Sequence, residues 1–211
     1  MGIPVMILGD SGSGKSASMR HFGADDIILY NVGKKPLPFR GRFTKTAHGD
    51  AYSTIIGTLV KADAKCYVVD DAQYLMAGEF MRTANQTGYQ KFTDIALNFW
   101  TLIQTVINDT PEDVIVYFLS HIERDICGNE KMKTIGKMLD EKITLEGLFT
   151  IVLKTKVQDG RYMFTTRTSG TDPVKTPIGM FEEATVDNDL KAVDEAIRAY
   201  YGFNNNMEEK A

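Results

Sequence analysis

The stretch Gly9-Asp10-Ser11-Gly12-Ser13-Gly14-Lys15-Ser16 fits the pattern G-x-x-x-x-G-K-[ST] at every fixed position. The apolar run at residues 3–8 predicts a short buried strand before it, and residues 17–22 predict the start of a helix after it. This strand–loop–helix context distinguishes a phosphate-binding loop (P-loop) from a bare glycine-rich turn. We therefore expect the fold to be organised around this loop.

The residue types in the loop suit a nucleotide with its metal ion. Glycines let the backbone N–H groups point at phosphate oxygens, and a helix that begins there adds the positive end of its dipole. Lys15 can reach the β- and γ-phosphates, and the hydroxyl of Ser16 can ligate Mg²⁺. The residues expected to bind ATP are Gly9, Asp10, Ser11, Gly12, Ser13, Gly14, Lys15, Ser16 and Ala17.

Length and composition suit one globular domain. The chain has 211 residues, of which 43% are hydrophobic and 25% charged, so we expect a single domain over residues 1–203 and a disordered tail over residues 204–211. No apolar run approaches the roughly 20 residues of a membrane span, and the first strand leaves no room for a signal peptide. Cys66 and Cys127 form no metal pattern, which favours the cytoplasm. The net charge of −4 argues against a strongly basic nucleic-acid binder, although residues 34–45 carry only positive charge.

Strands and helices alternate along the chain. Strands are expected at residues 26–32, 65–71, 114–121, 148–157 and 161–166, and helices at residues 50–61, 72–82, 92–108 and 190–201. Asp159-Gly160 predicts a hairpin between the last two strands. This order predicts an α/β fold with a mainly parallel sheet flanked by helices and a C-terminal β-hairpin and helix. Ligands of such sheets bind beyond the carboxyl ends of the strands.

Two carboxylates follow the apolar run Cys66–Val69. We expect Asp70 to hold the water shell of Mg²⁺ together with Ser16, as a Walker B aspartate does; the alternative is a carboxylate that caps the next helix. Asp71 stands where many ATPases of this type carry a glutamate that orients the attacking water, and it is one methylene shorter. Asp71 either polarises water or caps the helix.

The strand at residues 114–121 ends in Ser120 and His121. A strand that ends in a polar group there matches the sensor position of additional-strand P-loop ATPases, whose side chain donates to the γ-phosphate or the attacking water. Either residue can serve, and the alternative for His121 is a surface or a buried, hydrogen-bonded histidine. With Lys15 and Asp71, these two complete the expected catalytic set.

Basic residues around the C-terminal hairpin are candidates for a finger that reaches the nucleotide of a neighbouring subunit. Lys154 and Lys156 share one face of a strand, because side chains alternate between faces. The alternative is that they are exposed lysines that keep an edge strand from aggregating. The full set of candidates is Lys154, Lys156, Arg161, Arg167 and Lys175.

Several strings resemble phage-encoded nucleotide-binding proteins with a RecA-like core, a group that includes the Sak-type ATPases linked to single-strand annealing and recombination. Besides the P-loop and Val68-Val69-Asp70-Asp71, the strings are Lys35-Pro36-Leu37-Pro38-Phe39, Gly136-Lys137-Met138-Leu139-Asp140, Thr176-Pro177-Ile178-Gly179-Met180-Phe181 and Asn188-Asp189-Leu190 with Tyr200-Tyr201. The resemblance implies a RecA-like fold that binds single-stranded DNA in an ATP-dependent manner. It also implies a homo-oligomer with nucleotide near the subunit interface.

The resemblance further implies which loops face DNA. By position these are Thr83–Lys91, with Tyr89 and Lys91, and Ile122–Lys142, with Lys131 and Lys133. The sequence departs from the RecA-like pattern at one point. Recombinases of that type carry the catalytic glutamate just after the second strand, whereas this chain has Asn31-Val32-Gly33-Lys34 there. Either Asp71 takes that role or hydrolysis is slow.

Three functions compete at this stage. The first is an Mg-ATP-dependent ATPase that binds single-stranded DNA in recombination, annealing or replication. The second is a nucleotide-switched adaptor or loader with weak ATPase activity, which binds a phage replication or recombination protein. The third, a small-molecule phosphotransferase, is less favoured because the sequence has no clear arginine-rich lid. GTP is not favoured either, since Thr155-Lys156-Val157-Gln158-Asp159 is one residue too long for the guanine-reading motif.

Overall fold

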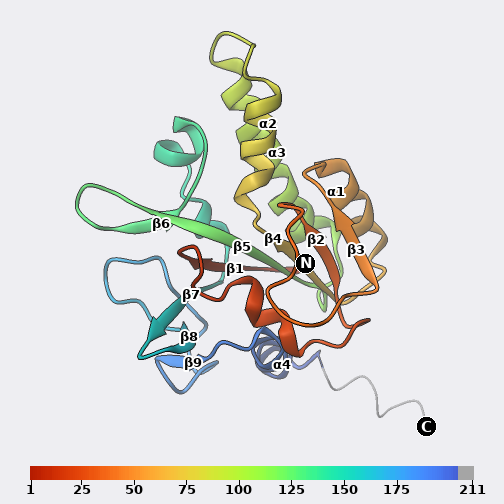
Figure 1. The fold of residues 1–211 in the computed structure, drawn as a ribbon, viewed down its shortest axis with the longest axis vertical. Helices are drawn as coiled ribbons and strands as arrows, with labels where there is room; N and C mark the ends of the chain where they lie inside the picture. Colours follow the sequence, from red (N-terminus) through yellow and green to blue (C-terminus); the bar gives the residue numbers. More distant parts are fainter. Residues whose placement is uncertain (204–211) are drawn as a thin grey trace.

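The computed structural model describes residues 1–203, so the tail expected at residues 204–211 lies outside the described residues (Figure 1). The strands are β1 (Ile3–Gly9), β2 (Ile28–Asn31), β3 (Lys45–His48), β4 (Cys66–Asp70), β5 (Ile115–Arg124), β6 (Glu130–Met132), β7 (Ile151–Gln158), β8 (Arg161–Thr165) and β9 (Thr185–Asp187). The α-helices are α1 (Tyr52–Lys61), α2 (Gln73–Arg82), α3 (Gln90–Asp109) and α4 (Leu190–Tyr201). Short 3₁₀ or π segments are η1 (Ser16–His21), η2 (Met138–Lys142) and η3 (Leu145–Leu148).

One sheet organises the described residues. Its strand order is β3-β2-β4-β5-β1-β7-β8-β9, and β6 pairs with β5 outside this path. Neighbours from β3 to β7 are parallel, whereas β8, β9 and β6 join antiparallel. The prediction of an α/β fold with a mainly parallel sheet is therefore confirmed. The predicted C-terminal hairpin corresponds to β7 and β8, and the predicted last helix corresponds to α4.

Helices cover both faces of the sheet, which explains why its inner strands are mostly apolar before their carboxyl ends. Helices α1, α2 and α3 pack on one face, above the sheet in Figure 1, and η1 and α4 pack on the other. Successive residues of one strand enter opposite layers: Met6 and Leu8 of β1 join the first, Val5 and Ile7 the second. Within residues 1–203, the structure forms no helix with the length and apolarity that a bilayer crossing requires.

The parallel registers bring several polar residues to one edge of the sheet. Gly9 at the end of β1 lies opposite His121 of β5, and Asn31 at the end of β2 lies opposite Asp70 of β4. The central position of β5, between β1 and β4, places His121 between the P-loop and the two aspartates. The sheet therefore gathers the P-loop and the ends of three other strands at its carboxyl edge.

The structure differs from the sequence-based expectations in several segments. The helix expected after the P-loop, which Gly23 can end, is present as the six-residue 3₁₀ helix η1, and so short a segment contributes little macrodipole. Strand β5 continues through Arg124 and pairs with β6 in a hairpin. The short strands β3 and β9 were not predicted, because neither has a run of buried apolar residues.

Helix α4 is attached to the sheet by one polar cluster. Asp194 accepts a hydrogen bond from the hydroxyl of Tyr117 on β5 at 2.9 Å and from Nε of Arg198 at 2.6 Å. The guanidinium of Arg198 also donates to the backbone oxygens of Asp113 and Lys65, at 3.0 and 2.8 Å. Each member has its partner inside a largely buried site, so removing one would leave the others unpaired.

We expect Asp194→Ala to lower the free energy of unfolding by about 3 kcal/mol, because it leaves the buried Tyr117 hydroxyl and the Arg198 guanidinium without their hydrogen-bond acceptor. Urea denaturation followed by circular dichroism measures this change. The neighbouring exposed Glu195 provides the control, and Glu195→Ala should stay within about 0.5 kcal/mol of the wild type. Equal effects of the two variants would show that this cluster does not hold α4.

Candidate active site

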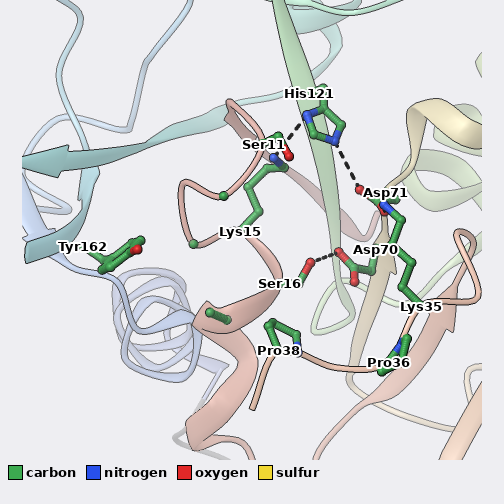
Figure 2. A pocket seen from close by; sticks show the side chains of 13 residues that line it. Ser11, Lys15, Ser16, Lys35, Pro36, Pro38, Asp70, Asp71, His121 and Tyr162 are labelled. Atoms are coloured by element: carbon green, nitrogen blue, oxygen red, sulfur yellow. Dashed lines mark hydrogen bonds and ion pairs between the residues drawn. The ribbon is translucent and has the colours of Figure 1, made fainter. Parts of the chain in front are cut away.

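A cavity of about 390 Å³ lies at the carboxyl edge of the sheet, and Figure 2 shows the side chains around it. Its walls come from the P-loop, the end of β4, the end of β5, the loop after β2 and strand β8. The residues that line it are Ser11, Gly12, Gly14, Lys15, Ser16, Ala17, Lys35, Pro36, Pro38, Asp70, Asp71, His121 and Tyr162.

Steric limits explain the glycines of the P-loop. Gly12 and Gly14 have φ angles of 76° and 97°, in the left-handed region that other residues avoid. A Cβ at Gly14 would also lie 2.8 Å from Cδ1 of Tyr162, and a Cβ at Gly9 would collide with Oγ1 of Thr155. Ser13 fixes the loop to β7 through a 2.5 Å hydrogen bond between its hydroxyl and that of Thr155. Contacts with β7 and β8 thus hold the loop in one conformation.

The ammonium group of Lys15 turns back onto its own loop. It donates to the backbone oxygens of Gly9 and Asp10, at 2.9 and 2.8 Å. Burial lowers the pKa of Lys15, while the carboxylates of Asp71 and Asp70 oppose that shift. Asp10 itself is held by Arg124 of β5, whose Nη2 lies 2.9 Å from Oδ2. Lys15 is therefore placed at the cavity wall with contacts that an incoming phosphate can replace.

Ser16 and Asp70 meet directly across the cavity. The hydroxyl of Ser16 donates to Oδ1 of Asp70 at 2.8 Å, and Asp70 is only 7% exposed (Figure 2). Burial raises the pKa of Asp70 to about 6, although the hydrogen bond from Ser16 and the charge of Lys15 act against it. Burial leaves this carboxylate poorly solvated, and a hydroxyl beside a carboxylate is a ligand set that suits Mg²⁺.

The fit to Mg²⁺ depends on the nucleotide as well as the protein. Within residues 1–203 there is no group of three or more His, Cys, Asp or Glu side chains that could hold a metal by itself. Magnesium sites of ATP-dependent proteins use one or two protein groups together with waters and substrate phosphates. Ser16 and Asp70 match that pattern, and Asp70 does not cap α2, whose N-terminus has no side-chain cap.

Asp71 lies between two nitrogen-bearing side chains. Its Oδ2 is 2.7 Å from Nζ of Lys35, and its Oδ1 is 3.5 Å from Nε2 of His121. The backbone of Asp71 has a φ of 61°, the left-handed region that costs free energy for a residue with a Cβ. Because α2 begins without a side-chain cap, the alternative in which Asp71 caps this helix is wrong. Its carboxylate instead faces the cavity.

Of the two sensor candidates, the structure brings only His121 to the cavity. Ser120 is fully buried, and its hydroxyl donates to Oε1 of Gln73 at 3.0 Å on the side of α2. Nδ1 of His121 lies 3.5 Å from Nζ of Lys15, and Nε2 lies 3.5 Å from Oδ1 of Asp71. Because the ammonium of Lys15 is a donor and the carboxylate of Asp71 an acceptor, this arrangement suits the tautomer that carries its proton on Nε2. Burial, followed by the charge of Lys15, lowers the pKa of His121, which favours the neutral ring. It can therefore donate one hydrogen bond into the cavity without adding charge.

The basic residues proposed as fingers lie away from this cavity. Lys154 is neutralised by Glu130 at 2.6 Å and by Asp172 at 3.3 Å. Arg167 donates to the backbone oxygen of Glu182 at 2.5 Å. Lys156 and Arg161 are exposed on the β7–β8 hairpin, and Lys175 is exposed beside β7, where its backbone pairs with Val152. No residue of this set lines the cavity.

The residues singled out in the two loops expected to face DNA differ in their surroundings. Tyr89 is 89% exposed at the α2–α3 connection, while Nζ of Lys91 lies 5.3 Å from the ring centroid of Phe80. Lys131 is paired with Asp140 and, at 3.6 Å, with Glu123. Lys133 instead lines a second cavity of about 370 Å³ that shares His121 and Lys35 with the first.

Sequence reasoning missed three residues that the structure brings to the loop or its cavity. Lys35 pairs with Asp71, Tyr162 packs against Gly14, and Arg124 holds Asp10. Lys35 belongs to the basic segment at residues 34–45 and begins one of the resembling strings, although neither feature indicated a contact with Asp71. Tyr162 and Arg124 carry no motif that could have identified them.

A comparison with protein-family models finds no match to this chain. A comparison with curated proteins also finds none. The geometry of the cavity and the chemistry of its residues are therefore what indicate a function.

The raised pKa of Asp70 predicts an unusual pH dependence of stability. Its folded pKa of about 6 exceeds the usual 3.8, so between these values the folded state binds more protons than the unfolded state. Without nucleotide, the protonated Asp70 contributes to the free energy of unfolding at low pH. This contribution is lost as pH rises, by up to about 1.4 kcal/mol per pH unit. Asp70→Asn should remove this loss and raise the thermal midpoint at pH 8.

Thermal denaturation at pH 5 and pH 8, with and without Mg²⁺ and nucleotide, measures the effect. Added Mg²⁺ with nucleotide should stabilise the wild type more at pH 8 than at pH 5, because a protonated carboxyl is a poor metal ligand. Asp63→Asn, in the exposed segment before β4, is the control and should behave as the wild type. A fall in the pH 8 midpoint of Asp70→Asn would contradict this account.

Proposed function

We propose that the protein binds ATP with Mg²⁺ in the P-loop cavity and hydrolyses it. The observation that carries this proposal is the 2.8 Å contact between Ser16 of the P-loop and the buried Asp70 at the end of β4. A glycine-rich turn without a ligand has no need to place a lysine, a hydroxyl and a nearly desolvated carboxylate around one cavity.

The residues divide the chemical work by position. The N–H groups of the P-loop and the ammonium of Lys15 bind the phosphates, and Ser16 with Asp70 holds the metal. Mg²⁺, when bound, neutralises charge that develops on the transferred phosphoryl group. Asp71 accepts a proton from the attacking water as general base, and His121 donates a hydrogen bond to the terminal phosphate as its sensor.

The strand order supports a RecA-like assignment among P-loop proteins. Strand β5 lies between β1 and β4 and carries His121 at its end, which is the position of the sensor strand in additional-strand ATPases. On this basis, and on the resemblance of the sequence strings, we propose that hydrolysis serves DNA recombination, single-strand annealing or replication in a phage setting. Single-stranded DNA is the proposed partner, and Tyr89 is an exposed aromatic side chain on which a base can stack.

A second candidate function has its own support. Both oxygens of Asp71 are already engaged, by Lys35 and by His121, and Lys15 is engaged by its own loop. A base held in this way favours slow turnover, which suits a nucleotide-switched adaptor or loader for a replication or recombination protein. Both functions begin with Mg-ATP at the same cavity, and they differ in whether DNA stimulates hydrolysis.

Lys15→Ala should weaken binding of a fluorescent ATP analogue by about 100-fold, because it removes charge-assisted hydrogen bonds to the phosphates. Fluorescence anisotropy in the presence of Mg²⁺ measures the affinity. Lys61→Ala removes the same charge from the exposed end of α1 and should leave the affinity unchanged. If the two variants bind the analogue equally well, the P-loop cavity is not the nucleotide site.

The partner is tested by ATPase rate and filter binding, each with and without single-stranded DNA across a salt series. We expect DNA to stimulate turnover, DNA binding to weaken as salt rises, and Tyr89→Ala to reduce DNA binding by about tenfold. If DNA neither binds nor stimulates hydrolysis, the adaptor function replaces the DNA-dependent one.

Light scattering with and without ATP reports the proposed homo-oligomer with nucleotide near its interface.

A further inference from the structure

We propose that Lys35 is a triphosphate-sensing switch, which pairs with Asp71 in the free protein and transfers to the γ-phosphate when a nucleoside triphosphate binds. This inference rests on the proposed function and adds to it a residue that separates triphosphate from diphosphate. The transfer exchanges one ion pair for another, and it frees Asp71 for the attacking water.

The base of the Lys35 side chain is fixed next to the catalytic edge of the sheet. The buried Asn31 donates from Nδ2 to the backbone oxygen of Lys35 at 2.6 Å, and its Oδ1 accepts from the Lys35 N–H at 3.2 Å. Asn31 ends β2 directly opposite Asp70. The two hydrogen bonds therefore set the distance between the Lys35 backbone and the residues that hold the metal.

The backbone around Lys35 is shaped to send its side chain across the cavity. Lys34 has a φ of 53°, a left-handed turn just before Lys35. At Gly33 an added Cβ would lie 3.0 Å from Oδ2 of Asp71 and 3.3 Å from Cε of Lys35. Glycine at this position leaves the space in which the ammonium and the carboxylate meet.

The far end of the side chain has room to move. The Lys35 side chain is 60% exposed, against 11% for Asp71, and its Nζ lies 5.0 Å from the ring centroid of Tyr74. Lys35 lines three cavities that share residues with one another, of about 390, 370 and 490 Å³. The ammonium can thus leave Asp71 while its backbone stays in place.

Charge balance supplies the reason for the transfer. In the free protein, the two cations Lys15 and Lys35 face the two carboxylates Asp70 and Asp71 in one cavity. The hydrogen bond to Asp71 raises the pKa of Lys35, so its ammonium stays charged. A triphosphate adds negative charge on the same side as Asp71, whereas a diphosphate leaves the terminal position empty. Lys35 consequently gains a competing partner only when the γ-phosphate is present.

Binding of fluorescent ADP and of a non-hydrolysable ATP analogue, each with Mg²⁺, tests the switch in Lys35→Met. The affinity for the ATP analogue should fall by about tenfold or more, because one charge-assisted contact is lost, while the affinity for ADP stays unchanged. Turnover should fall by about 100-fold. Lys35→Arg keeps the charge and should retain most of the preference for the triphosphate.

Lys45→Met is the matched control, since it removes the same charge from an exposed residue of β3 that does not line the cavity. The switch is overturned if Lys35→Met loses affinity for both ADP and the ATP analogue, or for neither. A rise in turnover also overturns it, because it would mean that Lys35 only restrains Asp71. If the wild type binds neither nucleotide, the proposed function itself fails. Circular dichroism on each variant checks that the fold is intact.

Discussion

The hydrogen bond between Ser16 and Asp70 connects the two halves of the candidate site. It spans 2.8 Å between the P-loop, which follows β1, and the end of β4, with β5 lying between the two strands. The parallel registers position both groups, and the two apolar layers of the sheet hold the registers. Because Asp70 is desolvated and its pKa is raised, its carboxylate would be stabilised by a cation, and the contact therefore indicates a cation site.

The polar and charged groups of the candidate site are partners of one another or of the nearby backbone. Lys15 is bonded to carbonyl oxygens of its loop, Ser16 to Asp70, and Lys35 to Asp71. Under the proposed function, a nucleotide and its metal would separate these groups and would exchange internal hydrogen bonds and ion pairs for external ones. Such an exchange costs less free energy than leaving buried polar groups unpaired.

Much of the fold could be predicted because its signals are local. The P-loop pattern, the apolar strands and the Asp159-Gly160 hairpin each depend on nearby residues. The orientation of strand-end side chains could not be predicted as well: Ser120 and His121 are neighbours, yet alternation sends Ser120 to α2 and His121 to the cavity. Lys35 was missed because its role depends on Asn31 and on a left-handed turn at Lys34.

The most direct test is a crystal structure of the protein with Mg²⁺ and a non-hydrolysable ATP analogue. The account predicts that the metal separates Ser16 Oγ from Asp70 Oδ1, now 2.8 Å apart, and that Lys15 leaves the carbonyl oxygens of Gly9 and Asp10 for the phosphates. An analogue bound elsewhere, or one bound in the cavity with the Ser16–Asp70 hydrogen bond intact, would contradict it.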